Sequence, residues 1–324
     1  MPKRDSLLDA LERLNRLARE PISDGVRDEL LRGLAHPSNV IVARAAEIMG
    51  RSGQAEFIPP LLAKCERLLE QGAEADPKCR AKEAIVLALD ALENTYESVY
   101  LRGITCVQME AVFREMREDM AANLRGYCAQ ALARMNYAEA HYALVNLLVD
   151  PQLPARLAAA NAVAYIGDEK SELLLRMKVL TGDADLQVMG GCFAGLLAIE
   201  PERSVPFVAG FLASTESALA EVAALALGES RLPAAFAALR NCWDNLVDYN
   251  FRKPLLLAIA LLRSDEAVDF LLHVVREEGR GAALKALEAL VIYGAEERRR
   301  EQVRAAAEAS GDPKVREAFQ AQFR

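Results

Sequence analysis

One pattern of apolar, basic and small residues returns along most of the chain. A representative copy is the segment 124–132, LRGYCAQAL, which begins and ends on an apolar residue and carries small residues between. The spacing between the last apolar residues of successive copies ranges from 29 to 45 residues, and such near-constant periods predict a solenoid of repeats. The nine anchors aligned in this way are Met49, Leu87, Leu132, Val163, Leu196, Leu227, Leu261, Leu290 and Phe323.

The pattern also indicates how each repeat is built. In the copy 155–163, ARLAAANAV, small residues recur at helical spacing, which lets a neighbouring helix approach closely. Turn signals such as Asp76-Pro77 and Asp150-Pro151 precede the motif, and Gly50 directly follows the first anchor. Each repeat is therefore predicted to consist of a helix, a turn, a second helix and a loop.

The composition favours the same all-α class. Apolar residues make up 52% of the 324 residues and aromatic residues only 6%, a balance that suits helix-on-helix packing. Because each repeat buries its apolar face against its neighbours, we expect one elongated repeat domain over 1–324 with eight to nine helix pairs. Residues 1–23 predict an N-terminal capping helix, with leucines at helical spacing and Pro21 at its end.

Charge and chemistry narrow the function. The net charge is −8 with no basic arm, which makes nucleic acid an unexpected partner. Six cysteines lack metal-like spacing, and the longest suggestive apolar run, 255–262, is too short to span a membrane. The histidines form no metal-binding or catalytic motif, and no phosphate-binding glycine motif occurs. We therefore expect a cytoplasmic protein without catalytic residues, bound metal or cofactor.

The repeat pattern resembles the HEAT repeat of the armadillo-type superfamily, in the short form typical of phycobilin lyases, over about residues 24–324. This resemblance implies a right-handed α–α superhelix with the second helix of each pair on its concave side. It also implies a hydrogen-bonded ladder between an Asp in the turn and an Arg six positions later. Asp119 with Arg125 and Asp150 with Arg156 have this spacing.

The ladder is expected to be incomplete elsewhere. Asp76 with Arg80 and Asp312 with Arg316 are closer in sequence than the pattern requires. The copies that end at Leu196, Leu227, Leu261 and Leu290 carry Met189, Ala220, Pro254 and Ala283 at the position of the arginine. The alternative role for the motif arginines, a basic stripe that binds phosphates, is less favoured because Arg125 and Arg156 each have an aspartate at the required distance.

Two segments depart from the period. Residues 96–116 predict an extended insertion, on which Arg102, Gln108 and Glu110 alternate and share one face. We expect these three side chains to contact a partner, with a purely structural loop as the alternative.

The second departure holds the only tryptophan of the chain. Trp243, Asp244, Tyr249 and Arg252 combine aromatic and charged groups in the way that interaction hot spots do. They are predicted to contact a partner, and the alternative is that Trp243 closes the core of the solenoid.

A solenoid without a catalytic constellation is typical of an interaction scaffold that holds a protein or peptide partner. The resemblance leaves two alternatives. One is a phycobilin-lyase-like enzyme that handles a tetrapyrrole, and the other is a HEAT-like DNA-repair protein, which the acidic charge disfavours.

Overall fold

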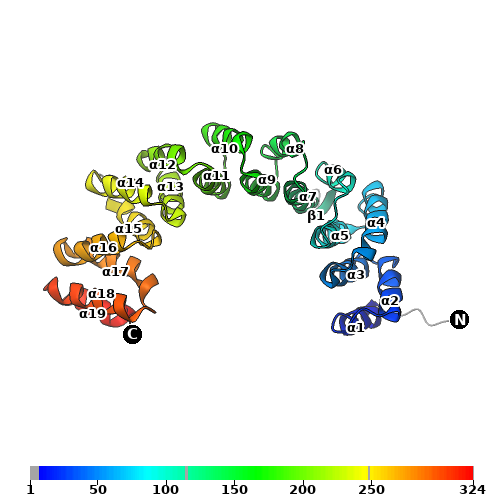
Figure 1. Cartoon of the computed structure of the whole chain (residues 1–324), viewed down its shortest axis with the longest axis horizontal. Coiled ribbons are helices and arrows are strands. Elements are labelled where there is room, and N and C mark those ends of the chain that lie inside the picture. The colour runs from blue at the N-terminus through cyan, green and yellow to red at the C-terminus, as the bar shows by residue number, and fades with distance from the viewer. Residues whose placement is uncertain (1–6, 114–115, 247–248, 324) are drawn as a thin grey trace. The chain divides into compact units, whose positions relative to one another are not determined.

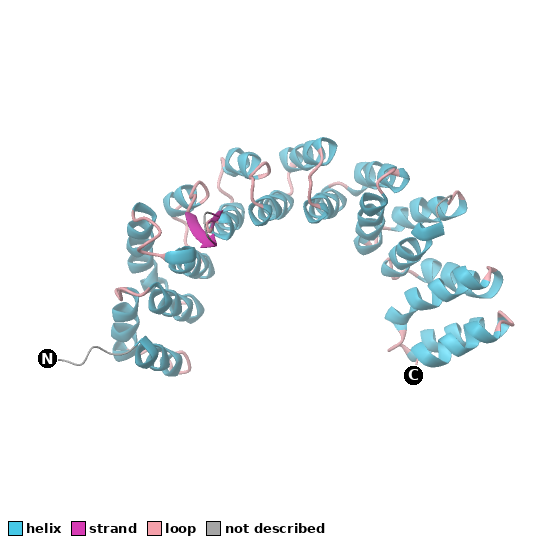
Figure 2. Ribbon diagram, turned by 180° about the vertical axis from the view of Figure 1, so that it is seen from behind, coloured by secondary structure: helices cyan, strands magenta, loops and turns pink. Residues whose placement is uncertain are grey.

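The computed structural model describes residues 7–113, 116–246 and 249–323. These described residues form 19 α-helices, several short 3-10 turns and one two-stranded sheet, which confirms the all-α class (Figures 1 and 2). The chain divides into two compact units, unit 1 (Met1–Ile166) and unit 2 (Gly167–Arg324), each built from helix pairs. Whether the two units act as one domain stays a prediction.

Unit 1 contains four helix pairs, preceded by α1. The second helices α3, α5, α7 and α9 lie side by side in one layer, while the first helices α2, α4 and α6 form another (Figure 1). The helices are α1 (Leu7–Leu17), α2 (Asp24–Leu34), α3 (Asn39–Ser52), α4 (Ile58–Glu70), α5 (Arg80–Ala91), α6 (Ser98–Gly103), α7 (Ala122–Arg134), α8 (Ala140–Leu147) and α9 (Leu153–Ile166), with 3-10 turns η1 (Ala55–Phe57) and η2 (Pro77–Cys79).

Helix α1 packs against α2 and α3, at the place expected of an N-terminal cap. It buries Leu14 in this contact and leaves Leu7 and Leu8 exposed. Helix α1 therefore has one face packed on the first helix pair and one face exposed in this structure.

The insertion at 96–116 is only partly extended. It begins with the short helix α6, which packs on α7 as the first helix of its pair. The strands β1 (Met109–Phe113) and β2 (Met116–Asp119) follow as an antiparallel pair, with Met109 opposite Asp119 (Figure 2). The surplus residues of this repeat therefore form a hairpin where other repeats have a tight turn.

Unit 2 contains five helix pairs arranged in the same way. The second helices α11, α13, α15, α17 and α19 pack in succession, and α12 packs on α14 as α16 does on α18. The helices are α10 (Glu169–Thr181), α11 (Leu186–Ile199), α12 (Pro201–Ala209), α13 (Ser217–Ser230), α14 (Pro233–Asp244), α15 (Arg252–Leu261), α16 (Asp265–Glu277), α17 (Arg280–Leu290), α18 (Glu297–Ala309) and α19 (Pro313–Gln322), with 3-10 turns η3 (Gly210–Ala213), η4 (Tyr249–Phe251) and η5 (Val291–Tyr293).

The repeated motif occupies the second helix of every pair, and seven of its nine anchors are buried. Two anchors are wrong. Leu87 is 44% exposed, whereas Leu89 in the same helix is fully buried. Leu261 is half-buried, whereas Ile259 is fully buried. In both copies the fully buried residue, Leu89 or Ile259, lies two positions from the predicted one. Several apolar residues follow one another there, so the sequence alone did not show which of them faces the core.

Two further sequence predictions concern the apolar helices and the cysteines. Among the described residues, no helix is both long and apolar enough to cross a membrane. All six cysteines are unpaired, and Cys65, Cys79, Cys128 and Cys192 are buried. Burial raises the pKa of the Cys65 and Cys192 thiols to about 12, so these side chains stay protonated and pack as small apolar groups.

Candidate functional site

Arg125 is the centre of the predicted ladder. Its Nη1 donates to Asp119 Oδ2 at 2.7 Å and to the carbonyl of Cys106 at 2.8 Å. Its Nε and Nη2 donate to the two carboxylate oxygens of Asp150, both at 2.8 Å, so the guanidinium links its own repeat to the next. The side chain is 97% buried, with 3% exposed. The Asp119–Arg125 bond therefore lies where the resemblance implies it.

Arg125 and its partners hold each other ionised. Burial alone would raise the pKa of Asp119, but the N–H groups of Gln108 and Ala121 and the Arg125 guanidinium outweigh it and lower this pKa. Burial likewise opposes the charge on Arg125, while hydrogen bonds to Asp150 and Asp119 raise its pKa. Four of the five N–H hydrogens of the Arg125 guanidinium therefore point at protein acceptors. This arrangement favours a ladder role for Arg125 over phosphate binding.

The ladder continues to the preceding repeat through Asp76, whose basic partner is Lys82 and not the predicted Arg80. Asp76 is fully buried and accepts from the backbone N–H groups of Ala81 and Lys82 at 2.8 and 2.9 Å. Lys82 Nζ lies 3.8 Å from the same carboxylate, so Lys82 takes the place that was given to Arg80. Asn39, at the start of α3, donates to Asp76 Oδ1 at 3.0 Å and connects the first repeat.

Gln108 and Glu110 belong to this ladder, which corrects their assignment to one exposed face. Gln108 is 7% exposed, accepts from Lys82 Nζ at 2.6 Å and donates to the carbonyl of Asp76 at 2.9 Å. Glu110 Oε1 accepts from Gln108 Nε2 and from the backbone N–H of Lys78, both at 2.6 Å. Lys78 has a φ of 62°, so Glu110 satisfies the donor of a left-handed turn. These internal contacts agree with the structural alternative, and the contact of Gln108 and Glu110 with a partner stays a prediction.

Arg102 is separated from them. It lies in helix α6, where the insertion was expected to be extended, and its Nη2 is 3.6 Å from Glu70 Oε1 of α4. Its side chain is 44% exposed. The three side chains therefore do not share a face, because the helix ends at Gly103 and only the following residues form the hairpin.

Beyond Asp150 the ladder changes its residues. Arg156 Nη1 donates to the carbonyl oxygens of Asp150 and Pro151, at 2.9 and 3.2 Å, and the Asp150 carboxylate accepts from Arg125. In unit 2, Lys178 of α10 forms an ion pair with Asp183 at 2.8 Å. Arg280 reaches Asp312 of the next repeat at 2.7 Å, while Arg316 is exposed. In these repeats of unit 2, Lys178 and Arg280 therefore pair with the turn aspartates in place of the motif arginine.

Trp243 packs within unit 2 on the neighbouring pair. Its ring meets the ring of Phe270 of α16 edge-on, with centroids 6.1 Å apart. Arg252 lies against two rings, with its guanidinium carbon 5.4 Å from the centroid of Trp243 and 4.3 Å from that of Tyr249. Trp243 is half-buried, so one part of its ring packs in unit 2 and another part is exposed to solvent.

The other members of this cluster divide between structure and solvent. Asp244 accepts from Arg240 Nε at 3.0 Å within α14, and Tyr249 is 65% exposed. Arg252 lies seven residues before Ile259, which is the position of the basic motif residue in Arg125 and Leu132. Its Nε atom is buried and has no hydrogen-bond partner among the described residues. Their contact with a partner stays a prediction.

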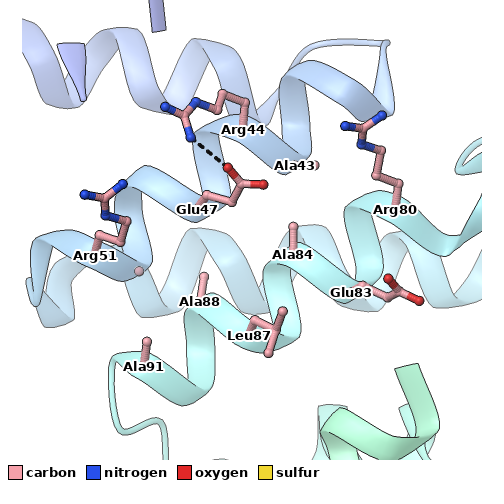
Figure 3. Close-up of a pocket in the computed structure, with 11 residues that line it drawn as sticks. Ala43, Arg44, Glu47, Arg51, Arg80, Glu83, Ala84, Leu87, Ala88 and Ala91 are labelled. Atoms are coloured by element: carbon pink, nitrogen blue, oxygen red, sulfur yellow. Dashed lines mark hydrogen bonds and ion pairs between the residues drawn. The ribbon is translucent and has the colours of Figure 1, made fainter. Parts of the chain in front are cut away.

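A groove between the second helices of the first two repeats was not predicted. It lies between α3 and α5 in unit 1 and has a volume of about 430 Å³ (Figure 3). Gly50 makes the helices approach closely at one point, since a Cβ there would lie 2.7 Å from Ala88 Cα. Alanines and the exposed Leu87 form its apolar floor: Ala43, Ala84, Leu87, Ala88 and Ala91. The sequence signal was the run of small residues, which we had assigned only to packing.

Charged side chains border this apolar floor. Arg44 is engaged by Glu47 at 2.8 Å and by Asn15 of α1 at 2.8 Å. Arg51 and Arg80 are exposed at opposite ends of the groove (Figure 3), and neither has an ion-pair or hydrogen-bond partner among the described side chains. The groove therefore offers two unpaired guanidinium groups.

Glu83 is the unusual acid of the groove. Burial, followed by the charge of Asp76, raises the pKa of Glu83 to about 7. Its carboxyl group forms no hydrogen bond or ion pair with the described part of the chain. Near neutral pH, a substantial share of Glu83 is therefore protonated and able to donate a hydrogen bond.

A second and larger cavity lies in unit 2 between α12, α13 and α14, with a volume of about 880 Å³. Its lining side chains are apolar or neutral, among them Leu212, Leu246, Phe251, Asn241 and Cys242. None of the lining residues is charged.

The acidic, cysteine and histidine side chains of the described ranges also bear on metal binding. No group of three or more His, Cys, Asp or Glu side chains is arranged there to hold a metal ion. His36 accepts the backbone N–H of Ser38 at 3.0 Å, a turn role of the kind expected from the sequence.

Comparison with known proteins gives only distant structural likenesses. No family model matches the chain, and no curated protein matches it. Among solved structures, human deoxyhypusine hydroxylase in complex with glycerol is 18% identical, with 81% of this chain and 92% of that chain covered and a TM-score of 0.32.

Two further solved structures are similar to the chain at still lower identity. The complex of CpcE and CpcF of phycocyanin lyase from Nostoc is 16% identical, with 94% of this chain and 95% of that chain covered and a TM-score of 0.35. A Kap121p mutant is 12% identical, with 99% of this chain and 46% of that chain covered and a TM-score of 0.46. At such low identity and TM-scores, neither a family nor an activity nor a partner passes to this chain.

Proposed function

We propose that this protein is a non-catalytic scaffold that holds a segment of a partner protein in the groove between α3 and α5. The observation that carries the proposal is the composition of this groove. It combines an apolar floor, including the 44% exposed Leu87, with the unpaired guanidinium groups of Arg51 and Arg80. Peptide sites need both features, since apolar contact supplies affinity and a few polar groups fix orientation.

The regular ladder supports the same proposal in a different way. Arg125, Asp119 and Asp150 are occupied with one another, and so are Lys82, Gln108 and Glu110. These buried charges hold successive repeats in register and are not available to a ligand. Arg51 and Arg80 of the groove are exposed and have no such partner among the described residues.

The test is partner capture by the full-length chain from an extract of its own cells, compared for three forms. Leu87→Asp places a charge on the floor of the groove, and Leu180→Asp makes the same change at a 68% exposed leucine of unit 2. We expect Leu87→Asp to lower capture of a specific partner at least tenfold and Leu180→Asp to leave it unchanged, with all three melting temperatures alike. Equal capture by the three forms would place the binding surface elsewhere.

A further inference from the structure

We propose that the α3–α5 groove selects an extended acidic segment that carries two carboxylates about five residues apart and an apolar side chain between them. This inference rests on the proposed function and states the chemistry of the partner. It follows from the charges left unpaired in the groove, the length between them and the width of the space (Figure 3).

The charges favour an anionic segment. Arg44 and Glu47 neutralise each other through their 2.8 Å ion pair, which leaves Arg51 and Arg80 as unpaired cations. The protein as a whole has a net charge of −8, so a general attraction for acidic chains is absent and the preference is confined to this groove. Guanidinium groups bind carboxylates through paired hydrogen bonds, which gives direction as well as attraction.

The length of the groove sets the spacing of the two acids. Arg80 begins α5, and Ala91 lines the other end of the groove, near Arg51. The eleven steps of the helix from Arg80 to Ala91 rise by roughly 16 Å at about 1.5 Å per residue. An extended chain advances about 3.3 Å per residue, so about five of its residues cover the same length.

The close approach of the two helices favours an extended occupant. Neighbouring packed helices have axes about 8–10 Å apart, so the floor between them is narrow and a single row of side chains reaches it. The Gly50–Ala88 contact shows that α3 and α5 are closely packed. An extended segment can place one apolar side chain on Ala84 and Leu87 while its neighbours point to either lip.

Glu83 makes this recognition dependent on pH. Glu83 lines the groove together with Arg44, Glu47 and Arg80, and the charge of Asp76 acts on it. On the side of α7 it acts on Tyr127, whose pKa is raised by burial and by Glu83. Burial raises the pKa of Glu83 to about 7, so the carboxyl group is mostly protonated at pH 6 and mostly ionised at pH 8. The ionised form repels a bound carboxylate, and affinity for the acidic segment therefore falls as pH rises, by up to roughly tenfold between these values.

The experiment uses fluorescein-labelled peptides of nine residues, each with a central leucine and two aspartates three to seven positions apart, together with lysine counterparts. Binding to the full-length protein is measured by fluorescence anisotropy at pH 6 and pH 8. We expect the strongest binding for aspartates about five positions apart and at least tenfold weaker binding for lysine peptides.

Three variants separate the contributions. Arg51→Ala with Arg80→Ala is expected to weaken binding at least tenfold, while Arg276→Ala with Arg298→Ala, at exposed arginines of unit 2, makes the same change in net charge and keeps binding. Glu83→Gln is expected to bind equally at both pH values. Circular dichroism melting confirms that each variant is folded.

Two results overturn the inference. Lysine peptides that bind as well as aspartate peptides contradict the charge preference, and aspartate peptides that bind without regard to Arg51 and Arg80 contradict the site. In either case a partner whose capture is lost in Leu87→Asp still upholds the proposed function, so the two failures are distinguishable.

Discussion

Arg125 contributes to stability through the carboxylates that it keeps paired. Replacing Arg125 with alanine leaves Asp119 and Asp150 without their main cation, and Asp119 is 95% buried as a side chain, with 5% exposed. We expect Arg125→Ala to lower the free energy of unfolding by about 3–5 kcal/mol, because breaking a buried pair leaves uncompensated charge. Urea unfolding checks this value.

The matched control is Arg32→Ala. Arg32 has the same side chain, is 69% exposed and pairs with Glu29 of its own helix. A surface pair of this kind contributes about 1 kcal/mol or less. If Arg125→Ala costs no more than Arg32→Ala, the ladder does not hold the repeats together.

The residue scale also shows what the sequence could provide. The spacing of six between Asp119 and Arg125 identified a real bond, because both residues lie at fixed positions of one regular repeat. The same spacing from Asp76 leads to Lys82, yet a preference for arginine led to Arg80. Gln108 and Asn39 were missed because they join the ladder from other segments, and that proximity exists only in the folded chain.

At the scale of elements, the second helices depend on glycine where they approach most closely. A Cβ on Gly50 would lie 2.7 Å from Ala88 Cα and 2.9 Å from Ala88 Cβ. Because backbone must move to accept it, we expect Gly50→Ala to destabilise the protein by about 1–3 kcal/mol. Thermal unfolding followed by circular dichroism measures the change.

Gly25→Ala is the comparison within the same unit. Gly25 lies in the first turn of α2, and nothing stands within 4 Å of a Cβ built there. Since alanine has the higher helix propensity, this variant is expected to be neutral or stabilised by up to about 1 kcal/mol. Similar destabilisation by both changes would mean that helix packing at Gly50 is looser than the structure indicates.

The helix pairs could be predicted from sequence, and the insertion only in part. Proline and aspartate at the turns and the small residues of the motif report directly on local backbone and helix contact, so the second helices were found in every repeat. The hairpin at β1 and β2 was expected as an extended loop, and α6 was not expected at all. Six residues of helix that depend on packing against α7 carry little periodic signal of their own.

The candidate groove was missed for a related reason. Leu87 was taken as a buried anchor, while the structure exposes it on the floor of the groove and buries Leu89 instead. The residue type alone does not show whether a leucine lies in the core or on the floor of a groove. Only the placement of α3 against α5 separates the two roles.

At the scale of the whole molecule, a repeat protein should respond to damage locally, because each pair contacts only its neighbours. Ala224 is fully buried in α13, which packs on α11 and α15 of unit 2. An aspartate there places an unpaired carboxylate in the core, at a cost of several kcal/mol. We expect Ala224→Asp to speed amide hydrogen exchange at least a hundredfold in α11, α13 and α15, while α3 and α5 of unit 1 keep their wild-type rates.

The control for this prediction is Ala218→Asp in the first turn of the same helix. Ala218 is exposed, and an acidic side chain near a helix N-terminus is favourable, so exchange in α13 should be unchanged or slightly slower. Mass spectrometry of peptides from both units gives the comparison in a single experiment. Faster exchange of equal size in α3 and α13 after Ala224→Asp would show that the chain opens as one cooperative block, and the nearest-neighbour description of these repeats would then be wrong.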